Sequence, residues 1–223
     1  MINELIFILQ TCTIATASLL ALKLSKEALI AFLALLCVLA NIFVLKQVTL
    51  FGLQVTAADA FSVGTILSLT MLQEYFKKEI AKQAIWICFF CMVFYTITSQ
   101  IHLMFIPTAQ DFSQTHFCSL LQFAPRITLA SLATYFLTLN LSNFLYSKIK
   151  KIWGAKYLIV RSFLMVAFIQ LIDTIFFSIL GLWGVVEKIG HVILVSFTIK
   201  LVATTLVTPA FLMAKRIKKT NSR

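Results

Sequence analysis

One acidic residue interrupts the middle of a long apolar stretch. Asp173 lies within residues 160–184, a run long enough to cross a bilayer as one helix. A carboxylate at that depth costs at least ~2.5 kcal/mol, so it usually faces the protein interior, has a partner and marks a pathway. Gln170 lies three residues before it and Phe177 four residues after it, so the three side chains share one helical face. We expect this face to form a wall of a binding site.

Three other charged residues, Asp59, Arg126 and Lys200, also lie inside apolar runs. Together with Asp173 they make two acids and two bases that could neutralise one another around a shared cavity. The alternative is that they form internal ion pairs that only fix helix packing. For Arg126 and Asp173 function is favoured, because an apolar replacement would be more stable if packing alone were needed. For Asp59 and Lys200 both interpretations stay open.

Two prolines could interrupt helices inside apolar runs, and one of them directly precedes Arg126. Pro125 removes a backbone donor inside its apolar run, and a break there would free a carbonyl group and widen the space beside the guanidinium of Arg126. Pro209 could do the same in the last run. The alternative at both positions is an ordinary kink.

The composition identifies the setting as a membrane. The chain has 223 residues, of which 61% are hydrophobic and 12% charged, and it contains 21 Phe. No soluble domain of this size would tolerate such a composition. The net charge of +11 does not point to nucleic acid, since Lys and Arg cluster at the ends of apolar runs, as loop charges do. Residues 1–223 are therefore expected to form a single transmembrane domain.

Seven apolar runs follow one another along the chain. They cover residues 5–22, 28–45, 52–73, 83–105, 117–147, 160–184 and 191–214. Connections rich in Lys and Arg alternate with connections poor in them, so seven spans would place the N-terminus outside and the C-terminus in the cytoplasm. Six spans stay open if the first run is not counted. The expected fold is an all-α polytopic bundle of six to seven transmembrane helices.

The chain carries no motif of an enzyme. It has no nucleophile with a base at useful spacing, no HExxH, no glycine-rich phosphate loop and no Walker motif, so we expect neither catalysis nor ATP hydrolysis by this chain. Cys88-x-x-Cys91 lacks a second pair or a nearby His, and its cysteines are interpreted as small buried apolar residues. No metal or other cofactor is expected.

A series of different short motifs follows the chain from residue 40 to residue 200. They are Ala40-Asn41-Ile42 with Lys46, Phe51-Gly52, the loop from Glu74 to Lys82 followed by Trp86, Arg126-Ile127 with Ala130-Ser131, Arg161, Gln170-x-x-Asp173-Thr174 and Lys200. At these intervals they resemble the queuosine precursor transporters, also called the vitamin uptake transporter family. The chain departs from the family at Thr70 and Lys77, where the family usually has Asp and Gly. Asp59 stands where the family tends to be small and apolar, and could replace the missing acid.

The resemblance implies a substrate class. The family imports 7-deazaguanines for tRNA modification: 7-cyano-7-deazaguanine, 7-aminomethyl-7-deazaguanine or queuine. A guanine-like edge presents N1–H and a 2-amino group side by side, and Asp173 can accept hydrogen bonds from both. The oxygen on the same edge needs a donor, for which the candidates are Asn41, Arg126, Gln170 and Lys200. Phe177 or Phe176 could stack on the ring, and Asp59 completes the expected binding set.

Three classes of function follow from these observations. The first is a secondary transporter or facilitator of a deazapurine base in the bacterial inner (plasma) membrane, with alternating access to a midmembrane site. The second is a substrate-binding subunit of an ATP-driven vitamin-type system, for which Ala17-x-x-x-Ala21 could pack the energising module. The third is a structural protein. The expected partners are the base and the lipid bilayer, without direct nucleic-acid binding, while a homo-oligomer stays open.

Overall fold

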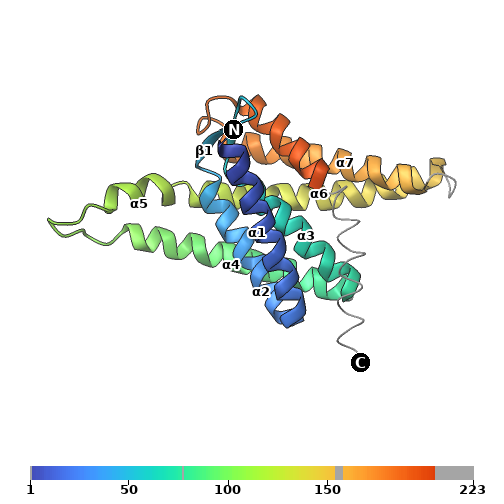
Figure 1. Cartoon of the computed structure of the whole chain (residues 1–223), viewed down its shortest axis with the longest axis horizontal. Helices are drawn as coiled ribbons and strands as arrows, with labels where there is room; N and C mark the ends of the chain where they lie inside the picture. Colours follow the sequence, from blue (N-terminus) through green and yellow to red (C-terminus); the bar gives the residue numbers. More distant parts are fainter. Residues whose placement is uncertain (1, 77, 154–157, 204–223) are drawn as a thin grey trace.

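The computed structural model of the protein describes residues 2–76, 78–153 and 158–203. This part of the chain is mostly helical, with one small β-hairpin (Figure 1). The elements are α1 (Ile2–Leu24), α2 (Lys26–Phe43), β1 (Gln47–Leu50), β2 (Leu53–Thr56), α3 (Asp59–Tyr75), α4 (Lys78–Leu103), α5 (Gln114–Leu121), α6 (Ala124–Trp153), α7 (Leu158–Phe177), the π-helical turn η1 (Ser178–Leu182) and a last helix, Ile189–Ala203.

Length and composition qualify several helices as membrane spans. Among the described residues, Ile2–Leu24, Lys26–Phe43 and Glu79–Leu103 are long and apolar enough to cross a bilayer, and Ala167–Leu182 and Ile189–Ala203 are shorter apolar helices. Large apolar side chains on α4, such as those of Phe90 and Phe94, are exposed, as expected for a face in contact with lipid. The prediction of an all-α membrane protein is confirmed at this level, and the number of six or seven spans stays a prediction.

Helices α1, α2 and α3 pack tightly because small residues lie where they meet. A Cβ atom added to Gly64 of α3 would collide with the Ile14 side chain of α1 and come within 3.0 Å of Leu36 of α2. Nearby, the buried hydroxyl groups of Ser68 and Ser18 form a hydrogen bond of 3.2 Å between α3 and α1. Close approach of small residues is the usual way in which helices associate in membranes.

The β-hairpin corrects one expectation. The third apolar run was expected to begin at Gly52, but residues 47–56 pair as antiparallel strands and α3 starts only at Asp59. The two turn residues, Phe51 and Gly52, have φ angles of 52° and 78°. Positive φ at both central positions is the requirement of the two-residue turn that matches the twist of a hairpin. The residues around Gly52 therefore form a hairpin turn, and the helix begins seven residues later than expected.

Long-range contacts hold the hairpin in place. Asn3 of α1 donates to the carbonyl oxygen of Thr49 at 3.0 Å, and the backbone N–H of Phe51 donates to Glu4 at 2.9 Å. On the other face, buried Leu50 and Val55 cluster with Val195 of the last helix. In Figure 1 the hairpin accordingly lies at the end of the molecule where α1 begins. It therefore joins the first helix to the last one.

The apolar run 117–147 is divided into two helices. α5 ends at Leu121 and α6 begins at Ala124, so that Pro125 falls in the first turn of α6, where a missing backbone N–H is tolerated. The carbonyl oxygen of Leu121, left without a helical partner, accepts a hydrogen bond of 2.8 Å from the side chain of Gln100 in α4. The expected break is thus present just before the proline, and the carbonyl group that it frees is hydrogen-bonded to a neighbouring helix.

The run 160–184 is helical but changes its winding near its end. After Phe177, α7 continues as the π-helical turn η1, in which Gly181 approaches Ala130 of α6 closely enough that an added Cβ would lie 3.3 Å from its methyl group. π-Helical turns are frequent at functional sites. The predictions made for Pro209 and for the end of the last apolar run lie outside the described residues.

Candidate functional site

A cavity of about 400 Å³ lies between α2, α3, α4, α6, α7 and the last helix. Its volume falls within the range of small-molecule binding sites, and its walls combine apolar surface with a limited number of polar groups, as such sites do. Five of the predicted binding residues line it: Asn41, Gln170, Asp173, Phe177 and Lys200. The helical face predicted from the spacing of residues 170, 173 and 177 therefore points into a void.

One end of the cavity carries an ion pair. Lys200 Nζ lies 2.8 Å from Asp173 Oδ2 and also donates to the hydroxyl oxygen of Thr174 at 3.3 Å. The side chains of Lys200 and Asp173 keep 13% and 33% of their surface exposed, so the pair is accessible from the cavity without being fully solvated. The hydroxyl group of Thr174 in turn donates to the carbonyl oxygen of Gln170 at 2.8 Å. Its hydrogen is thereby engaged, and the lone pairs of the hydroxyl oxygen are left to accept from the ammonium group of Lys200. The last helix and α7 thus present one acid and one base side by side.

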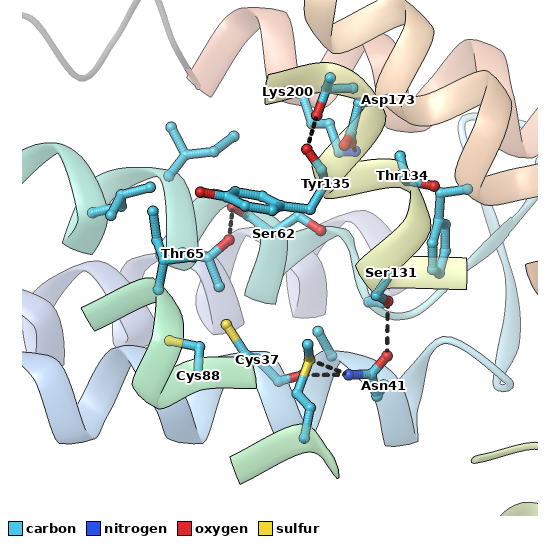
Figure 2. Close-up of a pocket in the computed structure, with 18 of the residues that line it drawn as sticks. Cys37, Asn41, Ser62, Thr65, Cys88, Ser131, Thr134, Tyr135, Asp173 and Lys200 are labelled. Atoms are coloured by element: carbon cyan, nitrogen blue, oxygen red, sulfur yellow. Dashed lines mark hydrogen bonds and ion pairs between the residues drawn. The ribbon is translucent and has the colours of Figure 1, made fainter. Parts of the chain in front are cut away.

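The opposite end of the cavity carries an amide (Figure 2). Asn41 of α2 is buried and donates to the carbonyl oxygen of Cys37 at 3.1 Å and to the sulfur of Met92 at 2.9 Å. Its carbonyl oxygen accepts a hydrogen bond of 3.2 Å from Ser131 of α6. Three helices therefore hold this amide in one orientation.

Hydroxyl groups form a polar stripe between the two ends. On α6, Ser131, Thr134 and Thr138 line the cavity at intervals of three and four residues, and Ser62 and Thr65 of α3 line it as well. Thr65 donates to the carbonyl oxygen of Ser62 at 2.8 Å, whereas the buried Thr134 hydroxyl has no hydrogen-bond partner within the described structure. A buried hydroxyl without a partner is destabilising, and a bound ligand would supply one.

The hydroxyls of α6 were missed by the sequence analysis, although their spacing was readable. Positions 131, 134 and 138 share one helical face. Each residue alone is an ordinary occupant of a membrane helix, because Ser and Thr can bond to the preceding turn of their own helix. Only the pattern of three, set against the apolar remainder of the run, could have indicated a polar wall.

Aromatic side chains close the sides of the cavity. Phe177 of α7, Phe89 of α4 and Tyr135 of α6 line it, and the rings of Phe89 and Tyr135 meet edge to face with centroids 4.8 Å apart. Such rings offer flat, polarisable surfaces on which a planar ligand can stack.

The structure places Arg126 elsewhere. Its Nε donates to the carbonyl oxygen of Leu180 at 3.0 Å and its Nη2 to that of Trp183 at 2.6 Å. Among the described residues it is not part of the cavity wall. The guanidinium instead ties the start of α6 to the end of η1, where carbonyl groups lack helical partners. The space that Pro125 was expected to open beside Arg126 is therefore filled by the end of another helix.

Asp59 also lies behind the cavity wall. Its side chain is buried at the start of α3, next to Ala58, which does line the cavity. Its carboxyl group has a side-chain hydrogen bond with Ser196 and lies within the field of the Lys200 charge. Its Oδ2 atom has no hydrogen-bond partner in the described part of the chain. Asp59 is therefore near the site without reaching a ligand in it.

The polar and aromatic groups of the cavity suit the binding of a small molecule. Within residues 2–76, 78–153 and 158–203, no three His, Cys, Asp or Glu side chains are grouped so as to hold a metal ion. The cavity presents an ion pair at one end, an amide at the other and hydroxyls and rings between them. It can accept a flat molecule that carries several hydrogen-bonding groups.

Comparisons with known proteins agree with this description. Residues 56–214 match the family described as "Putative vitamin uptake transporter". A protein of Bacillus subtilis (strain 168) named "Probable queuosine precursor transporter" is 29% identical over 202 residues, which cover 89% of this chain and 88% of the relative. No solved structure matches the chain. With most of its length matched, and with all of its cavity-lining helices except α2 inside that match, the chain belongs to the vitamin uptake transporter family.

Proposed function

We propose that this transporter imports queuosine precursors, the 7-deazaguanine bases, and binds them in the cavity between α2, α3, α4, α6, α7 and the last helix. The relative's printed name supports the substrate class. The observation that carries the proposal is the ion pair of Asp173 and Lys200 on the cavity wall. It provides a paired acceptor and donor at the place where a guanine-like edge needs both.

The ligand is oriented by its hydrogen-bonding edge. Its N1–H and 2-amino groups donate to the carboxylate of Asp173, and its oxygen at C6 accepts from the ammonium of Lys200. Each ligand group that enters the cavity without such a partner costs about 1–3 kcal/mol. A purine that lacks the 2-amino group should therefore bind less tightly than a 7-deazaguanine.

The rest of the base meets the other walls. Its plane stacks on Phe177 or Tyr135, and its substituent at C7 extends along the hydroxyl stripe of α6 toward Asn41. The unpartnered Thr134 hydroxyl supplies a hydrogen bond there. A nitrile, an aminomethyl group and the hydroxylated ring of queuine can all accept or donate such a bond.

Uptake proceeds by secondary transport or facilitated diffusion, in which the cavity opens to the two sides of the plasma membrane in turn. Intracellular use of the base in tRNA keeps its free concentration low and draws further base inward. With seven spans, the N-terminus lies outside and the C-terminus in the cytoplasm.

The test uses cells that lack their own importer and cannot make the base. Cells that express this chain should take up labelled queuine or 7-aminomethyl-7-deazaguanine and restore queuosine in their tRNA, whereas cells with Asp173→Asn should not. Asp111→Asn is a matched control, because Asp111 is an exposed carboxylate in the loop before α5. Background tRNA queuosine despite normal membrane expression of the wild type would overturn the substrate assignment.

A further inference from the structure

Asp59 is a buried acid, and the cation that acts on it within the described part of the chain, Lys200, is already paired with Asp173. Its side chain belongs to a residue that is 3% exposed, and its Oδ2 atom accepts no hydrogen bond from the described residues. A buried carboxylate with one oxygen left unpartnered is unfavourable in its ionised form, so a site of this kind tends to bind a proton. Asp59 therefore has a reason to bind a proton.

The backbone around Asp59 does not supply the missing donors. Asp59 is the first residue of α3, where free N–H groups would ordinarily favour a negative charge. However, the N–H groups of Phe61 and Ser62 donate to the carbonyl oxygen of Ala58, at 3.0 and 3.1 Å. Those two donors are consequently turned away from the carboxylate.

The ammonium group of Lys200 interacts electrostatically with two carboxyl groups, those of Asp173 and Asp59. Ser196 and Lys200 are four residues apart on the last helix and share one face. Lys200 is bonded to Asp173 at 2.8 Å, and its positive charge also acts on Asp59. If both acids were ionised, this group of three would hold one net negative charge inside the protein. A proton on Asp59 removes that charge.

Among the described residues, the other titratable groups that lie near α3 do not supply a compensating positive charge. From α1, Glu4 is bonded to the hairpin at Phe51, and from α2 and α4 the neighbouring groups are the uncharged thiols of Cys37 and Cys88 in the cavity wall. On the last helix, the charge that reaches Asp59 is that of Lys200. The balance therefore depends on which acid Lys200 pairs with.

We propose that Asp59 is a proton-binding site that is coupled to the ligand cavity through Lys200. While Lys200 pairs with Asp173, Asp59 takes a proton from water onto its unpartnered oxygen. When Asp173 is occupied by donors from a ligand, or is absent, Lys200 becomes available to Asp59, which then releases the proton to water. The role of the ligand in this exchange rests on the proposed function, whereas the proton site itself does not. By linkage, a proton and a ligand would each weaken the binding of the other.

The experiment is infrared difference spectroscopy of the full chain in lipid vesicles, taken between mildly acidic and alkaline pH without any ligand. The wild type should show the C=O stretch of a buried carboxylic acid, Asp59→Asn should lack it, and Ser196→Ala should shift its frequency. Asp173→Asn should also abolish the band, since Lys200 is then left to Asp59. Asp111→Asn should retain it.

The outcomes separate this inference from the substrate assignment, because no base is added. A wild-type spectrum without the acid band, or a band that survives Asp59→Asn, would overturn the proton site. If Asp59→Asn does not fold, an unchanged frequency in Ser196→Ala would do the same. A band that persists unchanged in Asp173→Asn would overturn the coupling through Lys200.

Discussion

Asp173→Asn is the substitution with the best-defined consequence, because it removes one charge of the ion pair and keeps the size of the side chain. Breaking a fully buried pair costs about 3–5 kcal/mol, whereas an exposed pair contributes about 0–1 kcal/mol. Asp173 keeps 33% of its side-chain surface exposed and Lys200 13%, so the pair lies between these limits. We expect a loss of about 2 kcal/mol in the free energy of unfolding.

The effect on ligand binding is expected to be similar in size to the effect on folding. Hydrogen bonds from the ligand to an ionised carboxylate contribute about 1.5–3 kcal/mol. At about 1.4 kcal/mol for each factor of ten, their loss should weaken the binding of queuine by about ten- to hundredfold. Thermal unfolding and equilibrium binding of the purified protein in lipid would measure the two quantities separately.

A double-mutant cycle distinguishes a binding pair from a packing pair. Lys200→Gln should destabilise the protein by leaving the carboxylate of Asp173 unpaired, and adding Asp173→Asn should regain part of that stability, because the unpaired carboxylate is then removed. It should not regain affinity, since neither the acceptor nor the donor for the ligand is restored. Full recovery of both, or wild-type affinity in Asp173→Asn alone, would refute the reasoning and assign the pair to helix packing.

Three further substitutions test other parts of the structure by the same two measurements. Thr134→Val removes an unpartnered hydroxyl and should weaken binding about tenfold without lowering stability; unchanged affinity would contradict a ligand contact there. Arg126→Met removes both hydrogen bonds to the end of η1 and should lower the unfolding free energy by about 1–3 kcal/mol at unchanged affinity; a selective loss of affinity would instead restore the direct binding role that the sequence suggested. Gly64→Ala should destabilise by about 1–3 kcal/mol through its collision with Ile14, and Ile14→Ala should relieve it; additive losses in the double variant would show that the two do not meet.

Local periodicity predicted which side chains of α7 lie on one face. Gln170, Asp173 and Phe177 share a face because helices repeat every 3.6 residues, and the same face lines the cavity. The apolar runs likewise gave the membrane setting, since a bilayer requires long apolar helices whose backbone groups are satisfied internally. Such properties depend on neighbours within a few residues along the chain.

Long-range partners could not be predicted in this way. The guanidinium of Arg126 bonds to carbonyl groups 54 and 57 residues away, and Ser131 bonds to Asn41 across 90 residues. A charge in an apolar run must find some partner, but its sequence position does not reveal which partner. The same limit explains why Arg126 was expected in the cavity and is found at the end of η1.

The sequence by itself determined that this chain is a helical membrane protein of the vitamin uptake transporter family, because hydrophobicity and motif order are properties of the linear chain. The tertiary structure decided which of its polar residues share a cavity, that Lys200 pairs with Asp173, and that Thr134 and Asp59 each keep an atom without a hydrogen-bond partner among the described residues. The physical reason is that pairing and burial depend on distances between helices, and those distances arise only when the helices pack.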